Sequence, residues 1–231
     1  MTSSKNSTPF TAGEYDKSIR SIVPFYDTIQ AETIDLVKTV KPDVKRWLDT
    51  GCGTGYLVEK AAQLFPDATF ILSDPSGDIL NAAAQRLQSY QGHRVKFLPP
   101  TPTEGLPAYL KNSEPQVITA ILSHHYYKPE QRRKATGICY SLLESGGLYI
   151  TVENVMPNSA GGVQLSLERW KRFQIEHGRT KEKAEERAKR FNSEYFPISI
   201  NEHISLLKET GFRTIEIYWK SHIQAGFYAI K

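Results

Sequence analysis

Trp47-Leu48-Asp49-Thr50-Gly51-Cys52-Gly53-Thr54-Gly55 is the stretch that decides how this sequence folds. It follows directly on an apolar run typical of a buried strand, and a helical pattern begins at its end. The three glycines let the backbone adopt positive φ and approach a ligand closely. The first turn of the following helix adds free N–H groups and the positive end of the helix dipole. The stretch therefore predicts a strand, a turn and a helix with a ligand at the turn.

Strand-sized apolar runs alternate with helical patterns on both sides of this stretch. The expected strands are residues 45–50, 69–73, 94–98, 116–122, 147–153, 213–220 and 224–230. Such alternation predicts a Rossmann-like α/β fold with a seven-stranded, mostly parallel sheet. Only a few residues join the last two strands, and a parallel pair needs a crossover of about a dozen. The last strand is therefore expected to be antiparallel.

The pattern divides the chain into four segments. The first holds a Ser/Thr-rich tail over residues 1–9, expected to be disordered, and two lid helices separated at Pro24. A ligand-binding core follows, and then a charged helical insertion expected to cap the acceptor site. A helix and two strands complete the core. The expected segments are residues 1–41, 42–154, 155–197 and 198–231.

Composition narrows the class of protein. No apolar run approaches the ~20 residues that span a bilayer, and the N-terminus has no apolar signal region. Two cysteines are too few for a disulfide framework, so we expect a cytoplasmic protein with no membrane partner. The net charge of +4 is local, because residues 163–192 hold nine Lys or Arg and five Glu. That segment is either a solvated helical face or a flank for an anionic substrate or RNA.

A second acid, Asp74, ends the second expected strand, 23 residues after Gly51. An acid at this place and spacing can accept hydrogen bonds from both hydroxyls of a ribose. The alternative is a structural role, in which Asp74 or Ser76 caps the next helix, with Pro75 near its first turn. Both roles are compatible with one another.

Polar and aromatic residues cluster after the fourth expected strand, in Ser123-His124-His125-Tyr126-Tyr127. Ligands of open α/β sheets bind at the carboxyl ends of the strands. His125 is a candidate general base, because an ordinary histidine titrates near neutrality. The alternative is that these side chains only form a wall of the cofactor site. No acid or third histidine has the spacing of a metal site.

The pattern D-x-G-x-G-x-G resembles motif I of class I S-adenosylmethionine-dependent methyltransferases. A dinucleotide fingerprint would need glycine at position 56, where this sequence has tyrosine. The resemblance implies a methyltransferase with S-adenosylmethionine as cofactor and S-adenosylhomocysteine as product. It implies that Asp49 orients the methionine amino group and Asp74 binds the ribose. Thr101 stands where an aspartate near the adenine is common. The cofactor residues implied are Asp49, Gly51, Cys52, Gly53, Gly55, Asp74, Pro75, Thr101 and Ser123.

Two further stretches, SIRSIVPFYD over residues 18–27 and LKETGF over residues 207–212, resemble one methyltransferase branch. It includes the carboxy-S-adenosylmethionine synthase of tRNA wobble-uridine modification. This resemblance implies that Tyr26 reaches the methionine carboxylate. The synthase also holds a carboxylate with an arginine late in the insertion, a region that here contains Arg190 at a different spacing from Gly211.

These patterns leave three functions open. The first is methylation of a small, anionic molecule contacted by His124, Tyr126 and Arg190. The second is RNA modification, including carboxy-S-adenosylmethionine synthesis, and the third is cofactor binding without catalysis. The sequence lacks an N/D-P-P-Y/F tetrad, which argues against methylation of the adenine amino group in nucleic acids. It gives no indication of the oligomeric state.

Overall fold

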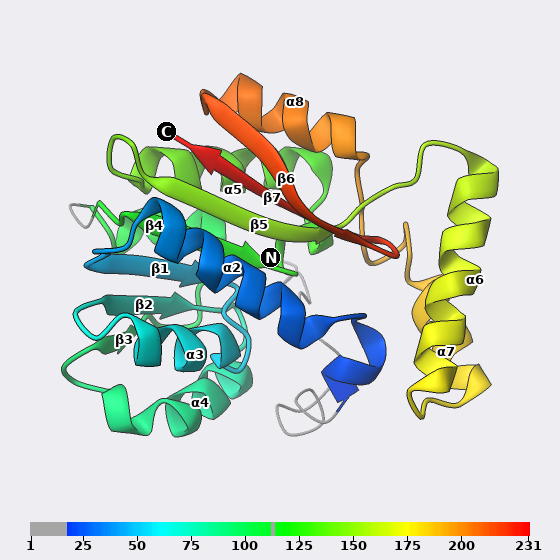
Figure 1. Cartoon of the computed structure of the whole chain (residues 1–231), viewed down its shortest axis with the longest axis horizontal. Coiled ribbons are helices and arrows are strands. Elements are labelled where there is room, and N and C mark those ends of the chain that lie inside the picture. The colour runs from blue at the N-terminus through cyan, green and yellow to red at the C-terminus, as the bar shows by residue number, and fades with distance from the viewer. Residues whose placement is uncertain (1–17, 112–113) are drawn as a thin grey trace.

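A twisted seven-stranded sheet runs through the part of the chain that the computed structural model describes, residues 18–111 and 114–231 (Figure 1). The tail expected over residues 1–9 lies outside the described residues. The strands are β1 (Arg46–Thr50), β2 (Thr69–Ser73), β3 (Val95–Phe97), β4 (Val117–Ile121), β5 (Leu148–Asn154), β6 (Thr214–Ser221) and β7 (Gln224–Ile230). Their order is β3-β2-β1-β4-β5-β7-β6.

β7 lies between β5 and β6 and pairs antiparallel with both, whereas the other pairs are parallel. This confirms the predicted fold class, including the antiparallel last strand. The sheet order reverses between β1 and β4, where their carboxyl ends separate. Ligands bind at such a point in open α/β sheets.

Helices cover both faces of the sheet. The named helices are α2 (Tyr26–Val40), α3 (Tyr56–Leu64), α4 (Gly77–Arg86), α5 (Pro129–Leu142), α6 (Ala160–Glu176), α7 (Lys181–Lys189) and α8 (Ile200–Thr210), with short 3-10 helices η1 (Gln88–Tyr90), η2 (Thr103–Ala108) and η3 (His124–Tyr126). Side chains from α2, α3 and α4 pack on one face with Trp47 and Phe70. Side chains from η2, α5 and α8 pack on the other with Leu48 and Tyr149. Burial on both faces explains why β4 and β5 are buried along almost their whole length.

The N-terminal helical segment is interrupted at residues 23–25, as Pro24 predicts. Phe25, the N-cap of α2, has a positive φ of 57°. The indole Nε1 of Trp170 on α6 donates a 2.6 Å hydrogen bond to the carbonyl of Ile22. This bond ties the start of the described chain to the insertion.

The insertion stands apart from the helices that flank the sheet. α6 and α7 form a pair beyond the end of the sheet where β5 finishes, on the right of Figure 1. Lys171 on α6 pairs with Glu185 on α7 at 2.9 Å. No helix within the described ranges is both long and apolar enough to cross a membrane.

Candidate functional site

The glycine turn after β1 has the conformation that its sequence predicts. Gly51, Gly53 and Gly55 have φ of 67°, 56° and 75°. The amides of Gly51 and Cys52 both donate to the carbonyl of Ser73 at the end of β2, at 2.8 and 3.0 Å. A Cβ at Gly51 would lie 2.4 Å from the Cβ of Ser123, so the turn closes directly against the exit of β4. Gly55 is the N-cap of α3 and shapes the turn without lining the cleft.

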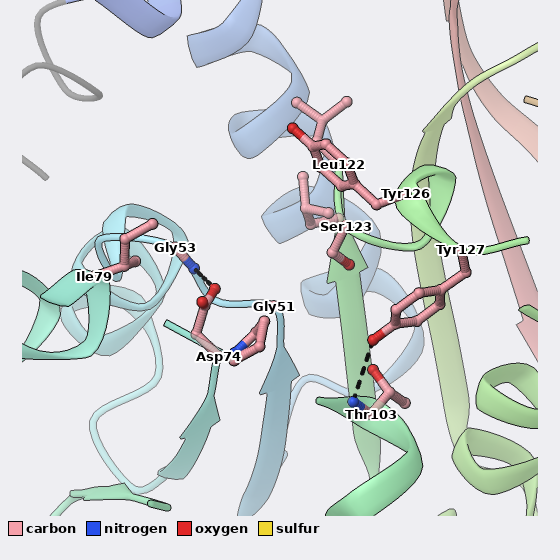
Figure 2. A pocket seen from close by; sticks show the side chains of 11 residues that line it. Gly51, Gly53, Asp74, Ile79, Thr103, Leu122, Ser123, Tyr126 and Tyr127 are labelled. Atoms are coloured by element: carbon pink, nitrogen blue, oxygen red, sulfur yellow. Dashed lines mark hydrogen bonds between the residues drawn. The ribbon is translucent and has the colours of Figure 1, made fainter. Parts of the chain in front are cut away.

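A two-lobed cleft opens above this turn. The Asp74 lobe is lined by Gly51, Gly53, Asp74, Pro75, Ile79, Thr103, Ile121, Leu122, Ser123, Tyr126 and Tyr127. The Asp49 lobe is lined by Tyr26, Gln30, Asp49, Gly51, Cys52, Gly53, Thr54, Leu57, Ile121 and Leu122. Figure 2 shows the Asp74 lobe, with Asp74 and Gly53 on one side and Ser123 and Tyr126 on the other. The lobes share their middle, at Gly51, Gly53, Ile121 and Leu122.

Asp74 is fixed by two backbone amides. Its Oδ2 accepts from the amide of Gly53 at 3.2 Å, and its Oδ1 accepts from the amide of Ser76 at 2.9 Å. Ser76, rather than Asp74, is the N-cap of α4, since its hydroxyl accepts from the amide of Ile79. Burial raises the pKa of Asp74, and the two amides oppose this rise. The carboxylate therefore keeps a fixed orientation and retains acceptor capacity toward the lobe.

Asp49 is oriented from inside the sheet. Its Oδ1 accepts a 2.7 Å hydrogen bond from the Thr119 hydroxyl, which accepts in turn from the indole of Trp47 at 2.9 Å. Burial raises the pKa of Asp49 to about 7, and the nearby Asp74 carboxylate adds to the rise. Gln30 faces the same lobe, and its buried Oε1 has no hydrogen-bond partner among the described residues. Two buried oxygens thus stand ready to accept hydrogen bonds from a cationic group.

Thr101, expected near the adenine, lies beside the cleft and not in its lining. The Thr101 hydroxyl donates to the Pro99 carbonyl at 2.6 Å, and Thr101 does not line the cleft. The chain enters η2 directly afterwards, and Thr103, the first residue of this 3-10 helix, lines the cleft. Its hydroxyl lies 2.8 Å from the Thr50 hydroxyl, which fixes it at the carboxyl end of β1.

His124, expected to contact the acceptor, does not line either lobe of the cleft. It is buried below the cleft, with Nε2 3.0 Å from the Thr103 hydroxyl and Nδ1 3.2 Å from the Tyr149 hydroxyl. Burial lowers its pKa to about 4, so it is neutral near pH 7. Both ring nitrogens have partners inside the protein, so the structure does not bring His124 to the expected acceptor site.

His125 does not have the access that a general base needs. Its side chain is buried behind Tyr126, and its Nδ1 lies 3.3 Å from an oxygen of the buried Glu153. Its ring packs on Tyr126 with 4.6 Å between ring centroids. Burial lowers its pKa, although Glu153 opposes the change. The structure therefore argues against His125 as the catalytic base, while Tyr126 and Ser123 do line the cleft.

The insertion meets the cleft through Tyr195. Its ring lies 5.3 Å from that of Tyr126, and the guanidinium groups of Arg187 and Arg190 lie 5.2 and 4.9 Å from its centroid. The Nε of Arg190 donates to Glu194 at 2.6 Å. Arg190 is thus one aromatic layer behind the cleft wall and does not line either lobe.

Sequence reasoning missed Gln30, Leu122 and Thr103. Gln30 follows Tyr26 by four residues and so lies on the same face of α2, a spacing that could have revealed it. Leu122 has a φ of 55°, a left-handed conformation that is uncommon for leucine, and no local pattern announces it.

Comparisons with known proteins agree with this geometry. Residues 48–149 match a family model described as a methyltransferase domain. The carboxy-S-adenosyl-L-methionine synthase of Trichodesmium erythraeum is 23% identical over 94% of this chain and 85% of its own length. That of Helicobacter hepaticus is 24% identical over 90% and 87%.

Solved structures share the fold. An O-methyltransferase family protein from Burkholderia thailandensis superposes with a TM-score of 0.62 at 15% identity, over 88% of this chain and 56% of its own. Human N-acetylserotonin methyltransferase in complex with S-adenosylmethionine gives 0.58 at 15%, over 94% and 57%. This chain therefore spans little more than half of those two proteins.

The matched domain contains the glycine turn and both acids that line the cleft. The residues present suit the cofactor, since a glycine cradle, a buried acid and an unpartnered amide oxygen surround one space. S-adenosylmethionine is the cofactor. Residues 48–149 form a methyltransferase domain, and the fold is the one that class I S-adenosylmethionine-dependent methyltransferases share.

Proposed function

We propose that this enzyme methylates a small anionic molecule that enters the cleft beside Tyr126. Asp74 would hold the ribose hydroxyls in its lobe. Asp49, Tyr26 and Gln30 would hold the methionine end of the cofactor in the Asp49 lobe. The two lobes join at Gly51 and Leu122, which supports a reacting methyl group at this junction. Bound there, the cofactor would supply a methyl group: its bond to sulfur would break as a bond to the acceptor forms, the electron pair would stay on sulfur, and the acceptor would lose its proton to solvent.

The residues of this chain would act by orientation and exclusion of water. Ile121 and Leu122 make the junction apolar, while Ser123 lies against the glycine turn. Holding two reactants in line can supply much of the rate enhancement without a base. This fits the absence of any histidine from the lining of either lobe.

The proposal that the acceptor is anionic rests on the arginines that lie behind Tyr126. Arg187 and Arg190 lie against Tyr195, which packs on Tyr126. The Tyr195 hydroxyl is buried and has no hydrogen-bond partner within residues 18–111 and 114–231. The charge of Arg190 is offset by its ion pair with Glu194. The cation of Arg187 and the hydroxyl of Tyr195, next to the cleft wall, favour a carboxylate or phosphate there.

A second candidate is carboxylation of the cofactor's methyl group. It is favoured by the similarity to carboxy-S-adenosyl-L-methionine synthases over nearly the whole chain. In that reaction the cofactor's methyl group would lose a proton, and a carboxylic acid would transfer its carboxyl group to the resulting carbanion, keeping the electron pair of the broken C–C bond and taking up that proton. Thr101 and the position of Arg190 depart from that branch, which is why we place methyl transfer first.

The test is to incubate the enzyme with methyl-labelled S-adenosylmethionine and a cell extract divided into RNA, protein and small-molecule fractions. We expect label in small molecules that an anion exchanger retains, together with S-adenosylhomocysteine. Label confined to RNA or protein would contradict the proposal. A carboxylated cofactor, identified by its mass, with no S-adenosylhomocysteine would establish the second candidate instead.

Binding of S-adenosylmethionine is expected to tighten as pH rises toward about 7. Asp49 has a pKa raised to about 7 in the free protein, so it is partly protonated below that pH. A methionine ammonium beside it favours the carboxylate, and binding must then release a proton. The dissociation constant should fall about tenfold between pH 6 and pH 8. Calorimetry in two buffers of different ionisation enthalpy measures both the affinity and the released proton.

Asp49→Asn is the control for this linkage. It keeps the side-chain shape but cannot ionise, so it should bind weakly and show no dependence on pH over this range. Equal pH dependence in the variant and the natural protein would show that Asp49 is not the titrating group.

A further inference from the structure

Asp27 joins three separate elements at the edge of the Asp49 lobe. Arg20, in the helical residues before α2, donates two 2.8 Å hydrogen bonds to it, from Nε to Oδ2 and from Nη2 to Oδ1. Tyr56, the first residue of α3, donates its hydroxyl to Oδ1 at 2.8 Å. A planar guanidinium bound through two parallel hydrogen bonds holds its partner in a defined orientation. We call this group the Arg20–Asp27–Tyr56 clasp.

The clasp sits beside the residue that lines the lobe. Tyr26 precedes Asp27 in the chain, and its ring lies 5.6 Å from that of Tyr56. The Arg20 guanidinium lies 5.1 Å from the Tyr56 centroid and 5.8 Å from that of Tyr26. Tyr56 directly follows Gly55, the last glycine of the turn. The clasp therefore connects the N-terminal helices to the glycine turn across the lobe.

The backbone before the clasp is strained. Phe25 has a φ of 57°, a conformation that costs a bulky residue of order 1 kcal/mol. Its ring packs on Trp219 of β6 at 6.0 Å, and Trp170 holds the carbonyl of Ile22. This sharp turn is what brings Tyr26 and Asp27 to the start of α2, facing the glycine turn. Such strain persists where the surroundings fix it, and it often marks a functional segment.

We propose that Asp27 is a positioning residue that holds Tyr26 over the Asp49 lobe and thereby slows release of the cofactor. The inference rests on the proposed function, which puts the methionine end of S-adenosylmethionine in that lobe. Arg20 lowers the pKa of Asp27, so the carboxylate is ionised at neutral pH. Nearly half of the Arg20 side chain and over half of that of Asp27 are exposed, and exposed ion pairs contribute little to global stability. Loss of the clasp should therefore loosen the lid without unfolding the sheet.

The experiment measures the dissociation rate of S-adenosylmethionine by stopped-flow displacement with S-adenosylhomocysteine. Asp27→Ala and Tyr56→Phe should each raise this rate about fivefold or more, because each loses hydrogen bonds to a charged group. The unfolding midpoint of the ligand-free protein should change little. Tyr56→Phe removes one hydroxyl only and remains informative if Asp27→Ala folds poorly. High salt should raise the rate in the natural protein and much less in Asp27→Ala.

The matched control is Asp67→Asn. It breaks an equally short and exposed ion pair, Lys45–Asp67 at 2.8 Å, which lies away from the cleft. That variant should release the cofactor at the natural rate. Unchanged rates in Asp27→Ala and Tyr56→Phe would overturn the inference, as would an equal increase in Asp67→Asn. Asp74→Ala separates a failure of this inference from a failure of the proposed function. Normal cofactor binding in Asp74→Ala would mean that the proposed placement of the cofactor is wrong, whereas weakened binding would leave only the role of the clasp in error.

Discussion

Replacing Asp74 with alanine is expected to weaken S-adenosylmethionine binding by about 1.5–3 kcal/mol, roughly tenfold to a hundredfold, while the protein stays folded. The carboxylate is held by the amides of Gly53 and Ser76 and presents its remaining acceptor capacity to the lobe. The ribose hydroxyls would donate charge-assisted hydrogen bonds to this carboxylate, and these bonds cannot form in the variant. Helix α4 keeps its own cap at Ser76, so the fold should survive. Titration calorimetry measures the loss.

Asp78→Ala is the matched control for this prediction. Asp78 is the acid in the first turn of α4, exposed and outside both lobes. It carries the same charge near the same helix end, so its removal tests for a general electrostatic effect. Similar affinities in both variants and the natural protein would leave Asp74 as a structural residue of the turn only.

Gly51→Ala should abolish measurable cofactor binding and lower the free energy of unfolding by about 2–4 kcal/mol. Two effects add here. A Cβ would lie 2.4 Å from the Cβ of Ser123, an overlap that costs about 1–3 kcal/mol in a packed site. The φ of 67° costs a further 1 kcal/mol or so for a residue with a side chain. Chemical denaturation measures the sum.

Two variants separate these effects. Gly146→Ala places a Cβ at a φ of 72° with nothing within 4 Å, so it should show the backbone cost alone. Adding Ser123→Gly to Gly51→Ala removes the overlapping Cβ and should restore part of the lost stability. If Gly51→Ala lowers the free energy of unfolding by no more than Gly146→Ala does, a side chain at position 51 does not overlap Ser123, and the argument from close contact fails.

The sequence was most informative where one physical constraint allows one answer. The short connection between the last two strands excluded a parallel pair, and β6 and β7 are antiparallel. The glycines and acids around β1 and β2 are fixed by the backbone itself, and the cleft is built on them. These features need no knowledge of distant parts of the chain.

The β4 exit could not be predicted in this way. Residues His124, His125 and Tyr126 form one turn of the 3-10 helix η3, so successive side chains point about 120° apart. Only Tyr126 faces the cleft, while the two histidines enter the interior. The sequence-based prediction placed His124, His125 and Tyr126 in one site because they are neighbours in the chain. Of these three residues, only Tyr126 lines the cleft. The same holds for Thr101 and Thr103, whose orientations depend on where η2 begins.

The insertion, residues 155–197, shows how little the sequence reveals about the ion-pair partners of charged residues. The cationic surplus of residues 163–192 is evident in the sequence, but the partner of each charge is not. Arg190 is the C-cap of α7 and pairs with Glu194 beyond the helix, whereas the helical spacing suggests Glu186. Pairings of this kind depend on where a helix stops.

The most direct test of the account is calorimetric titration of the natural protein with S-adenosylmethionine, S-adenosylhomocysteine and NADH. Both adenosyl ligands are expected to bind with one site per chain, and NADH is expected not to compete. Clear binding of NADH, with no heat from either adenosyl ligand, would contradict it.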